Sequence, residues 1–187
     1  MSQCYQQLQS NLAGFSTNIT ALINDLGLVS LTQCDHAAVR VNTAASADEL
    51  SQALQQHGEI ISNNIINGRP ILIIKLQQPL TIAGRSVSCI ELPYPNKPYP
   101  QEGWEHVELV LPEQAQDCQQ LQQQLLALSP MLSEVFAGNS DIKVKASSPS
   151  AATERLANPT IAFKRGGVCV KVHPHTIEAI IASEQSS

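Results

Sequence analysis

Hydrophobic and polar residues alternate along two short stretches of the chain, CDHAAVRV and GWEHVELVL. Apolar residues stand at every second position, beginning with Ala37 in the first stretch and with Val107 in the second. This period of two predicts strands with one buried face. Each stretch also contains an acid followed by a histidine, and the histidines, His36 and His106, fall on the face opposite the apolar one.

Apolar residues at steps of three and four predict helices in three other places. The first covers residues 1–29, with Gly27 as its C-terminal stop. The second is SADELSQALQQHG, with Ser46 as the candidate N-cap and Gly58 as its end. The third is QDCQQLQQQLLALSPMLSEVF, in which leucines repeat on one helical face. A short helix is also expected in HTIEAIIASEQSS at the end of the chain.

About three further strands follow each of the two middle helices. The first set contains Asn67-Gly68, a strong hairpin signal, between two apolar runs. The second set is read in DIKVKASSP, NPTIAFKR and GVCVKVHP. The proline-rich stretch LPYPNKPYPQEG, which cannot continue a sheet, separates the two halves.

The order strand, helix, three strands therefore occurs twice, and His36 and His106 stand 70 residues apart at equivalent positions. We predict an α+β fold with two βαβββ modules, residues 31–96 and 97–187, after an N-terminal helical segment at 1–30. The modules should form one compact structural domain. Its concave mixed sheet should carry the helices on the outside and a cleft on the inside.

Composition excludes several classes of partner. The net charge is -5 and the basic residues are scattered singly, so nucleic acid is not expected. No apolar run is long enough to cross a bilayer, and no signal sequence is visible, so we expect a cytoplasmic protein that does not enter membranes. Five widely spaced cysteines favour reduced thiols.

The strand alternation also predicts which side chains face the cleft. His36, Glu91 and His106 should converge there, with Glu108 and His173 nearby. The remaining inward residues by the same alternation are Cys34, Arg40, Cys89, Trp104, Cys169 and Lys171.

Two imidazoles and a carboxylate are ligands for a divalent metal ion such as Fe, Mn, Co, Ni or Zn. A single strand histidine is more often solvated or hydrogen-bonded, but its recurrence at equivalent positions favours a shared metal. Glu91 is open to a second interpretation, an ion pair with Arg40 or Lys171, and His173 is a further candidate ligand. Such a metal can stabilise an enolate or bind oxygen.

Arginine can bind an anionic substrate bidentately, and Arg40, Arg69 and Arg155 are candidates for this role, although each is open to a second interpretation as a solvated residue. Trp104, the single tryptophan, is expected as a wall of the cleft. For proton transfer the candidates are Glu108, and Lys171 if desolvation lowers its pKa.

Several stretches resemble the bacterial YecM family over nearly the whole chain, namely DHAAVRV, NNIINGRPI, IELPYP, YPQEGWEHVELVLP, SSPSAATERLANPT and KVHPHTIEAIIASEQS. The paired modules also resemble the vicinal oxygen chelate superfamily of glyoxalase, methylmalonyl-CoA epimerase, extradiol dioxygenases and bleomycin-resistance proteins. That superfamily places metal ligands on the first and last strand of each module, which the resemblance carries onto His36, Glu91 and His106. Where glyoxalase-like members carry a glutamate at the fourth position, this chain offers Lys171 or His173, depending on how the last strands are aligned.

Three functions follow as hypotheses. The first is a metal-dependent isomerase or epimerase that acts through a metal-stabilised enolate on a small, anionic, oxygen-bearing molecule. The second is a non-haem Fe(II) oxygenase, and the third is a binding protein that sequesters a small molecule without turnover. The oligomeric state is left open, and a monomer would suffice because both modules lie in one chain.

Overall fold

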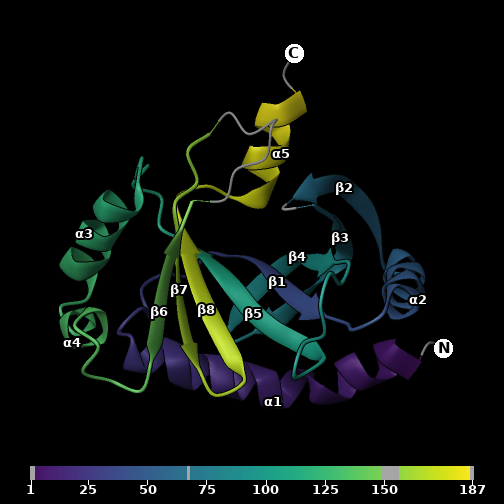
Figure 1. Ribbon diagram of the computed structural model, residues 1–187, viewed down its shortest axis with the longest axis horizontal. Coiled ribbons are helices and arrows are strands. Elements are labelled where there is room, and N and C mark those ends of the chain that lie inside the picture. Colours follow the sequence, from purple (N-terminus) through teal and green to yellow (C-terminus); the bar gives the residue numbers. More distant parts are fainter. Residues whose placement is uncertain (1–2, 67, 149–155, 186–187) are drawn as a thin grey trace.

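The computed structural model describes residues 3–66, 68–148 and 156–185 (Figure 1). Its elements, in chain order, are α1 (Gln3–Asp25), β1 (Cys34–Arg40), α2 (Ala44–Gln55), β2 (Gly58–Ile66), β3 (Arg69–Ile82), β4 (Arg85–Pro93), β5 (Gly103–Val110), α3 (Cys118–Leu128), α4 (Leu132–Phe136), β6 (Lys143–Ser147), β7 (Thr160–Arg165), β8 (Val168–His173) and α5 (Ile177–Gln185).

The strands form one mixed sheet in the order β2-β3-β4-β1-β5-β8-β7-β6. The first strands of the two halves, β1 and β5, lie antiparallel at its centre. Each also pairs in parallel with the last strand of its own half, β1 with β4 and β5 with β8. The predicted α+β fold with two βαβββ units is therefore confirmed, and the expected boundaries at residues 30 and 96 fall between elements.

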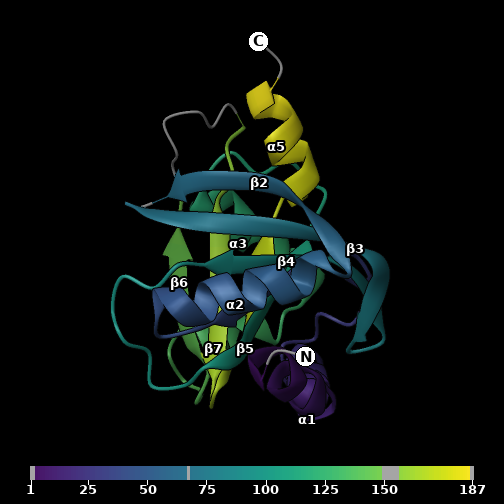
Figure 2. The same cartoon turned by 90° about the vertical axis from the view of Figure 1, so that its right-hand side faces the viewer.

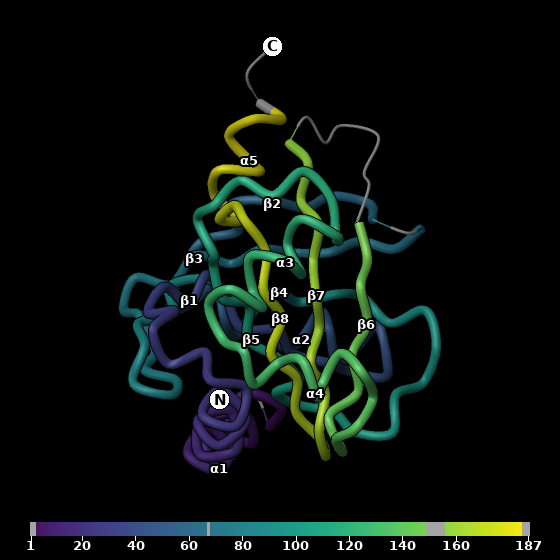
Figure 3. The backbone as a smooth tube through the Cα atoms, turned by 90° about the vertical axis from the view of Figure 1, so that its left-hand side faces the viewer, coloured from purple at the N-terminus to yellow at the C-terminus, as the bar shows by residue number. Residues whose placement is uncertain are grey.

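Helices α1 to α4 cover one face of the sheet, as predicted. The larger core joins α1, α3 and α4 to strands of the second module, and Figures 1 and 3 show these helices outside that part of the sheet. A second core lies under α2, which covers the first module (Figure 2). Because these helices bury the apolar faces of the central strands, the other face of the sheet is available for a site.

Helix α5 departs from the expected arrangement, because it lies on the cleft side of the sheet beside β2 and β3 (Figures 1 and 2). Its Ile181 packs in a small separate cluster with Ile71, Ile73 and Cys89. The helical period of the last residues predicts a helix with an apolar side, but it does not say which face of the sheet that side covers.

Three local predictions can be compared with the structure: the N-cap of the second predicted helix, the length of the third, and the hairpin. The N-cap of α2 is Thr43 and not Ser46, since the Thr43 side chain accepts a hydrogen bond of 3.0 Å from the Ser46 amide. The third predicted helix is broken into α3 and α4 around Pro130, which has no amide hydrogen to continue the helix. The predicted hairpin is present: β2 ends at Ile66, β3 begins at Arg69, and Gly68 has a φ of 77°.

Two expectations from composition can be compared with this structure. All five cysteines are free thiols, as predicted. Within the described ranges, no helix is both long and apolar enough to span a membrane.

Packing of α1 against the sheet should contribute strongly to stability. Leu22 is fully buried in the larger core, whereas Leu128 on α3 is 38 % exposed. Leu22→Ala should therefore lower the free energy of unfolding by about 3 kcal/mol, and Leu128→Ala by less than about 1 kcal/mol. Urea denaturation followed by circular dichroism measures both values, and equal losses would contradict this description of the core.

Candidate metal centre

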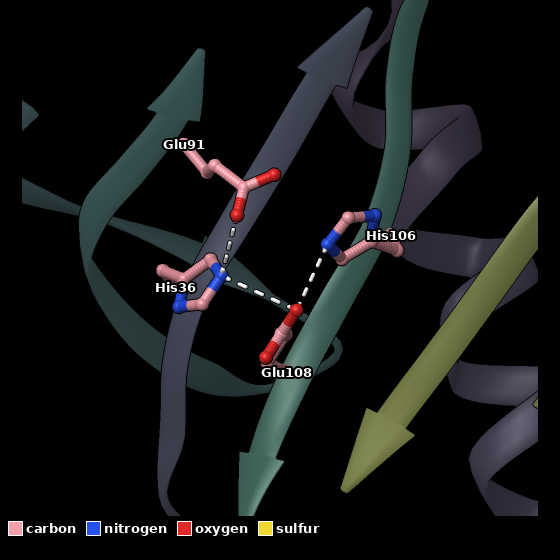
Figure 4. A group of neighbouring side chains, drawn as sticks. All are labelled: His36, Glu91, His106 and Glu108. Carbon is pink, nitrogen blue, oxygen red and sulfur yellow. Dashed lines mark hydrogen bonds and ion pairs between the residues drawn. The ribbon is translucent and has the colours of Figure 1, made fainter. Parts of the chain in front are cut away.

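Four side chains from three neighbouring strands meet on the cleft face: His36 from β1, Glu91 from β4, and His106 and Glu108 from β5 (Figure 4). One donor atom from each lies within 4.8 Å of all the others. The Glu108 Oε1 atom is 3.1 Å from the Nε2 atom of His106 and 3.5 Å from the Nε2 atom of His36. The structure thus brings His36, Glu91 and His106 together, as predicted, and adds Glu108 to the group.

The acids that precede the two histidines occupy β-bulges in the pairing of β1 with β5. Cys34 pairs with Leu109 and His36 with Glu108, so Asp35 is an extra residue on β1. Farther along, the β5 partner steps by two residues and leaves Glu105 as the extra residue of that strand. A bulge changes the direction of a side chain, and each of these turns an acid toward its neighbouring histidine.

Both acids contact the far side of the histidine ring. The Asp35 Oδ2 atom is 2.8 Å from Nδ1 of His36, and the Glu105 Oε2 atom is 2.5 Å from Nδ1 of His106. A hydrogen bond at Nδ1 fixes the ring and leaves Nε2 as the electron-pair donor, which is how metal-binding histidines are commonly held. Nε2 of His36 is buried and makes no hydrogen bond to the described residues.

The charges around the group fit a divalent cation. The carboxylates are Asp35, Glu91, Glu105 and Glu108, and the cations that contact them are Arg40 and Lys171. With neutral histidines, four acids and two bases leave a formal charge of about −2, which a divalent ion would neutralise. Donor types, ring orientation and charge therefore all fit a metal such as those expected from the sequence.

The buried charges of this group also shift the pKa values of its members. Burial alone would lower the pKa of His36, but the carboxylates of Glu108 and Asp35 outweigh it and raise this pKa well above its usual value. Burial would raise the pKa of Glu108, but Lys171 and His36 hold it well below its usual range. For Glu105, burial is outweighed by His106 and Arg40, which lower its pKa to about 2. The acids thus attract positive charge, which a metal ion can supply in place of a proton on His36.

The strand register shows which residue of β8 corresponds to Glu91 of β4, an alignment that the sequence left open. His36 pairs with Cys89 in the first module and His106 pairs with Cys169 in the second, so the last strands align on their cysteines. Lys171 therefore occupies the position of Glu91. Its Nζ atom lies 2.7 Å from Glu108 Oε1, and Glu108 on β5 is the fourth member of the group.

His173 lies beside this group and is not one of its four members. Its Nε2 atom is 3.4 Å from Glu108 Oε2 and 3.6 Å from Asp35 Oδ2, and the side chain is buried. Burial lowers the pKa of His173, which keeps the ring neutral near neutral pH. The structure therefore places this predicted ligand next to the cluster, in contact with Glu108.

A cavity of about 540 Å³ opens from the group and is lined by His36, Glu91, Glu108 and Lys171. Two of the predicted substrate-binding arginines, Arg40 and Arg69, also line it. Arg40 is already engaged, with its guanidinium 2.8 Å from Glu105 and 3.5 Å from Glu91, so it holds the acids of the centre in place. The third arginine, Arg155, lies outside the described residues.

Trp104 is not a wall of this cavity. Its ring stacks on Phe15 of α1 at 5.7 Å between centroids, and its Nε1 atom donates to the Leu8 carbonyl oxygen at 2.9 Å. The bulge at Glu105 shifts the alternation of β5 by one residue, so Trp104 turns to the helix-covered face. The alternation rule placed it on the wrong side for this reason.

Fold and centre together define an α+β protein of two like modules with a candidate divalent-metal centre at their junction. Comparison with known sequences then identifies its family. A family model described as "YecM protein" matches residues 4–184. The chain therefore belongs to the YecM family.

Relatives and solved structures agree with this assignment. Protein YecM of Escherichia coli (strain K12) is 42% identical over 184 residues, covering 97% of this chain and 95% of that protein. An uncharacterized protein of Haemophilus influenzae is 36% identical over 181 residues, covering 91% and 90%. A solved structure titled "Structural Genomics, Protein EC4020" has a TM-score of 0.80 at 38% identity, covering 98% of this chain and 94% of that one.

A weaker match is a methylmalonyl-CoA epimerase from Mycobacterium tuberculosis, with a TM-score of 0.44 and 12% identity, covering 78% of this chain and 90% of that one. A similarity at this level carries no argument about function.

Proposed function

We propose that this protein binds a divalent metal ion through His36, Glu91, His106 and Glu108 and catalyses isomerisation or epimerisation of a small anionic molecule. The observation that carries the proposal is the paired orientation of the two histidines. Each has Nδ1 held by the acid that precedes it, and each turns Nε2 toward Glu108, while Glu91 also faces Nε2 of His36. The resemblance of the two modules to the vicinal oxygen chelate superfamily supports a metal centre at this junction.

A divalent ion bound there would act as a Lewis acid and stabilise negative charge that develops on a substrate oxygen. The protein itself must then move a proton. Glu108 is placed for this, because Oε1 faces both histidines and the metal position, which leaves Oε2, 3.4 Å from His173, as the oxygen that would accept the proton.

Lys171 is not suited to the role of base that the sequence suggested. Burial would lower its pKa, but the attraction of Glu108 and Glu91 raises that pKa above the usual lysine value. Lys171 is therefore a fixed positive charge beside Glu108 and the cleft, where it can hold Glu108 and an anionic substrate.

The number of donors favours an isomerase over an oxygenase. Non-haem Fe(II) oxygenases use two histidines and one carboxylate and keep the remaining positions open. Here Glu108 adds a second carboxylate to His36, Glu91 and His106. A centre with four protein donors has fewer positions for both oxygen and a substrate.

Proton exchange with solvent separates the three hypotheses. Metal-loaded protein should be incubated in D₂O with small 2-oxo and 2-substituted carboxylic acids and followed by proton NMR. We expect loss of the signal from the hydrogen next to the carbonyl or carboxylate, no oxygen uptake, and no exchange with His106→Ala. Oxygen consumption with Fe(II) would instead support the oxygenase, and binding of an acid without exchange would support sequestration.

The two acids at the bulges should tune the metal affinity. Asp35→Asn and Glu105→Gln keep the shape of each side chain but remove the charge that holds the histidine ring. Each change should weaken metal binding by roughly 10- to 100-fold, as for other outer partners of metal ligands. Isothermal titration calorimetry measures the effect, with Glu113→Gln on the surface as the control, and unchanged affinities would show that these acids do not support the centre.

A further inference from the structure

We propose that the cleft takes a small monocarboxylic acid with an aliphatic chain, with its oxygen atoms toward the metal centre and its chain against a wall of isoleucines. This isoleucine wall consists of Ile66, Ile71 and Ile73 from β2 and β3, and Ile177, Ile180 and Ile181 from α5. The inference rests on the proposed function, because the metal centre would hold the oxygen end of the molecule.

The isoleucine wall is apolar surface on the cleft side, apart from the two main cores. Ile71, Ile73 and Ile181 are buried together with Cys89, and Ile66 and Ile177 pack against them but stay partly exposed. All six isoleucines line the same cavity as His36, Glu91 and Glu108. Cavities of this kind bind the apolar part of a ligand by removing its surface from water.

The position of the wall is tied to the metal centre through Asp35. The Ile177 amide at the start of α5 donates to Asp35 Oδ2 at 2.9 Å, and the same oxygen atom contacts Nδ1 of His36. Farther along α5, Glu184 accepts a hydrogen bond of 2.8 Å from Asn64 of β2. These hydrogen bonds fix the position of the isoleucine wall relative to the metal centre, so that one molecule can contact both.

The charges that line the cavity select a single negative charge. The acids and bases of the centre are balanced by a divalent ion, as described above. Among the other described residues that line the cavity, the charged side chains are Arg69, Lys145 and Glu184. Two bases and one acid leave about one positive charge, which matches a monocarboxylate better than a dicarboxylate or an amine.

Chain length provides the test. Zn²⁺-loaded protein is titrated with straight-chain monocarboxylates from acetate to octanoate, after one zinc ion per chain has been verified by elemental analysis. Each added methylene should tighten binding by about fourfold until the cavity is full. A dicarboxylate with as many carbon atoms as the best monocarboxylate should bind more weakly.

Variants of the wall separate its role from that of the metal. Ile177→Ser removes apolar surface from a partly exposed position and should flatten the dependence on chain length, with zinc content unchanged. Ile65→Ser is the matched control, because Ile65 neighbours Ile66 on β2 but is 62 % exposed and does not line the cavity. It should keep the wild-type dependence.

Three results would overturn the inference. Zinc-loaded wild type whose affinity does not depend on chain length would exclude the apolar subsite while the metal centre stands. The same holds if Ile177→Ser keeps the full dependence. Absence of zinc binding would remove the proposed function and this inference together, and the elemental analysis identifies that case before any acid is added.

Discussion

Replacing any one of His36, Glu91, His106 or Glu108 by alanine is expected to weaken divalent-metal binding by more than about 100-fold, while the chain stays folded. The expected loss exceeds the roughly 10- to 100-fold effect of removing an outer partner, because a donor atom itself disappears. Glu108→Ala is the most informative of the four, since it tests whether the second carboxylate on β5 is the fourth donor.

These affinities are measured by calorimetric titration of chelator-treated protein, with circular dichroism to verify folding. His57→Ala is a suitable control, because His57 stacks on Tyr5 at 5.1 Å and is not part of the group of four. A Glu108→Ala variant with wild-type affinity would reduce the centre to three donors and reopen the oxygenase hypothesis. Wild-type affinity in all four variants would contradict the centre as a whole.

Lys171→Met is expected to destabilise the metal-free protein by about 3 kcal/mol and to destabilise the metal-loaded protein much less. Lys171 lies 2.7 Å from Glu108, whose side chain is 9 % exposed, so its removal takes the lysine charge from a buried carboxylate and leaves it with histidine contacts. Breaking such a pair costs about 3–5 kcal/mol, and the lower end applies because the Lys171 side chain is 26 % exposed. A bound metal ion restores a positive charge beside Glu108 and also stabilises the folded state by mass action.

Chemical denaturation with and without saturating zinc gives both values. Lys164→Met is the control, because Lys164 lies on the exposed side of β7, and its loss should change stability by less than about 0.5 kcal/mol. If Lys171→Met lowers stability equally in both states, the lysine and the metal do not share Glu108.

The strand alternation and the internal repeat were enough to predict the fold and part of the centre. Once two equivalent strands had been recognised, the period of two placed His36, Glu91 and His106 on one face, and the structure brings them together. Glu108 was expected nearby as a base. The repeat could not show it as a donor, because its equivalent in the first module is Ala38.

The bulges could not be predicted, because pairing between distant strands decides where an extra residue is accommodated. Their result is a centre in which Asp35 and Glu105 hold the two histidines, while Trp104 turns away from the cleft. The repeated order of acid then histidine was the visible signal for the two acids. The placement of α5 was also beyond the sequence, since a helical period does not identify the face of the sheet that the helix covers.

The most direct test of the central claim is anomalous X-ray diffraction at the zinc absorption edge, on crystals grown with one equivalent of zinc. The structure predicts one strong peak within bonding distance, roughly 2.0–2.2 Å, of Nε2 of His36 and Nε2 of His106, with Glu91 and Glu108 as oxygen ligands. A zinc peak elsewhere on the molecule, with these four side chains bound only to one another or to water, would contradict the metal centre.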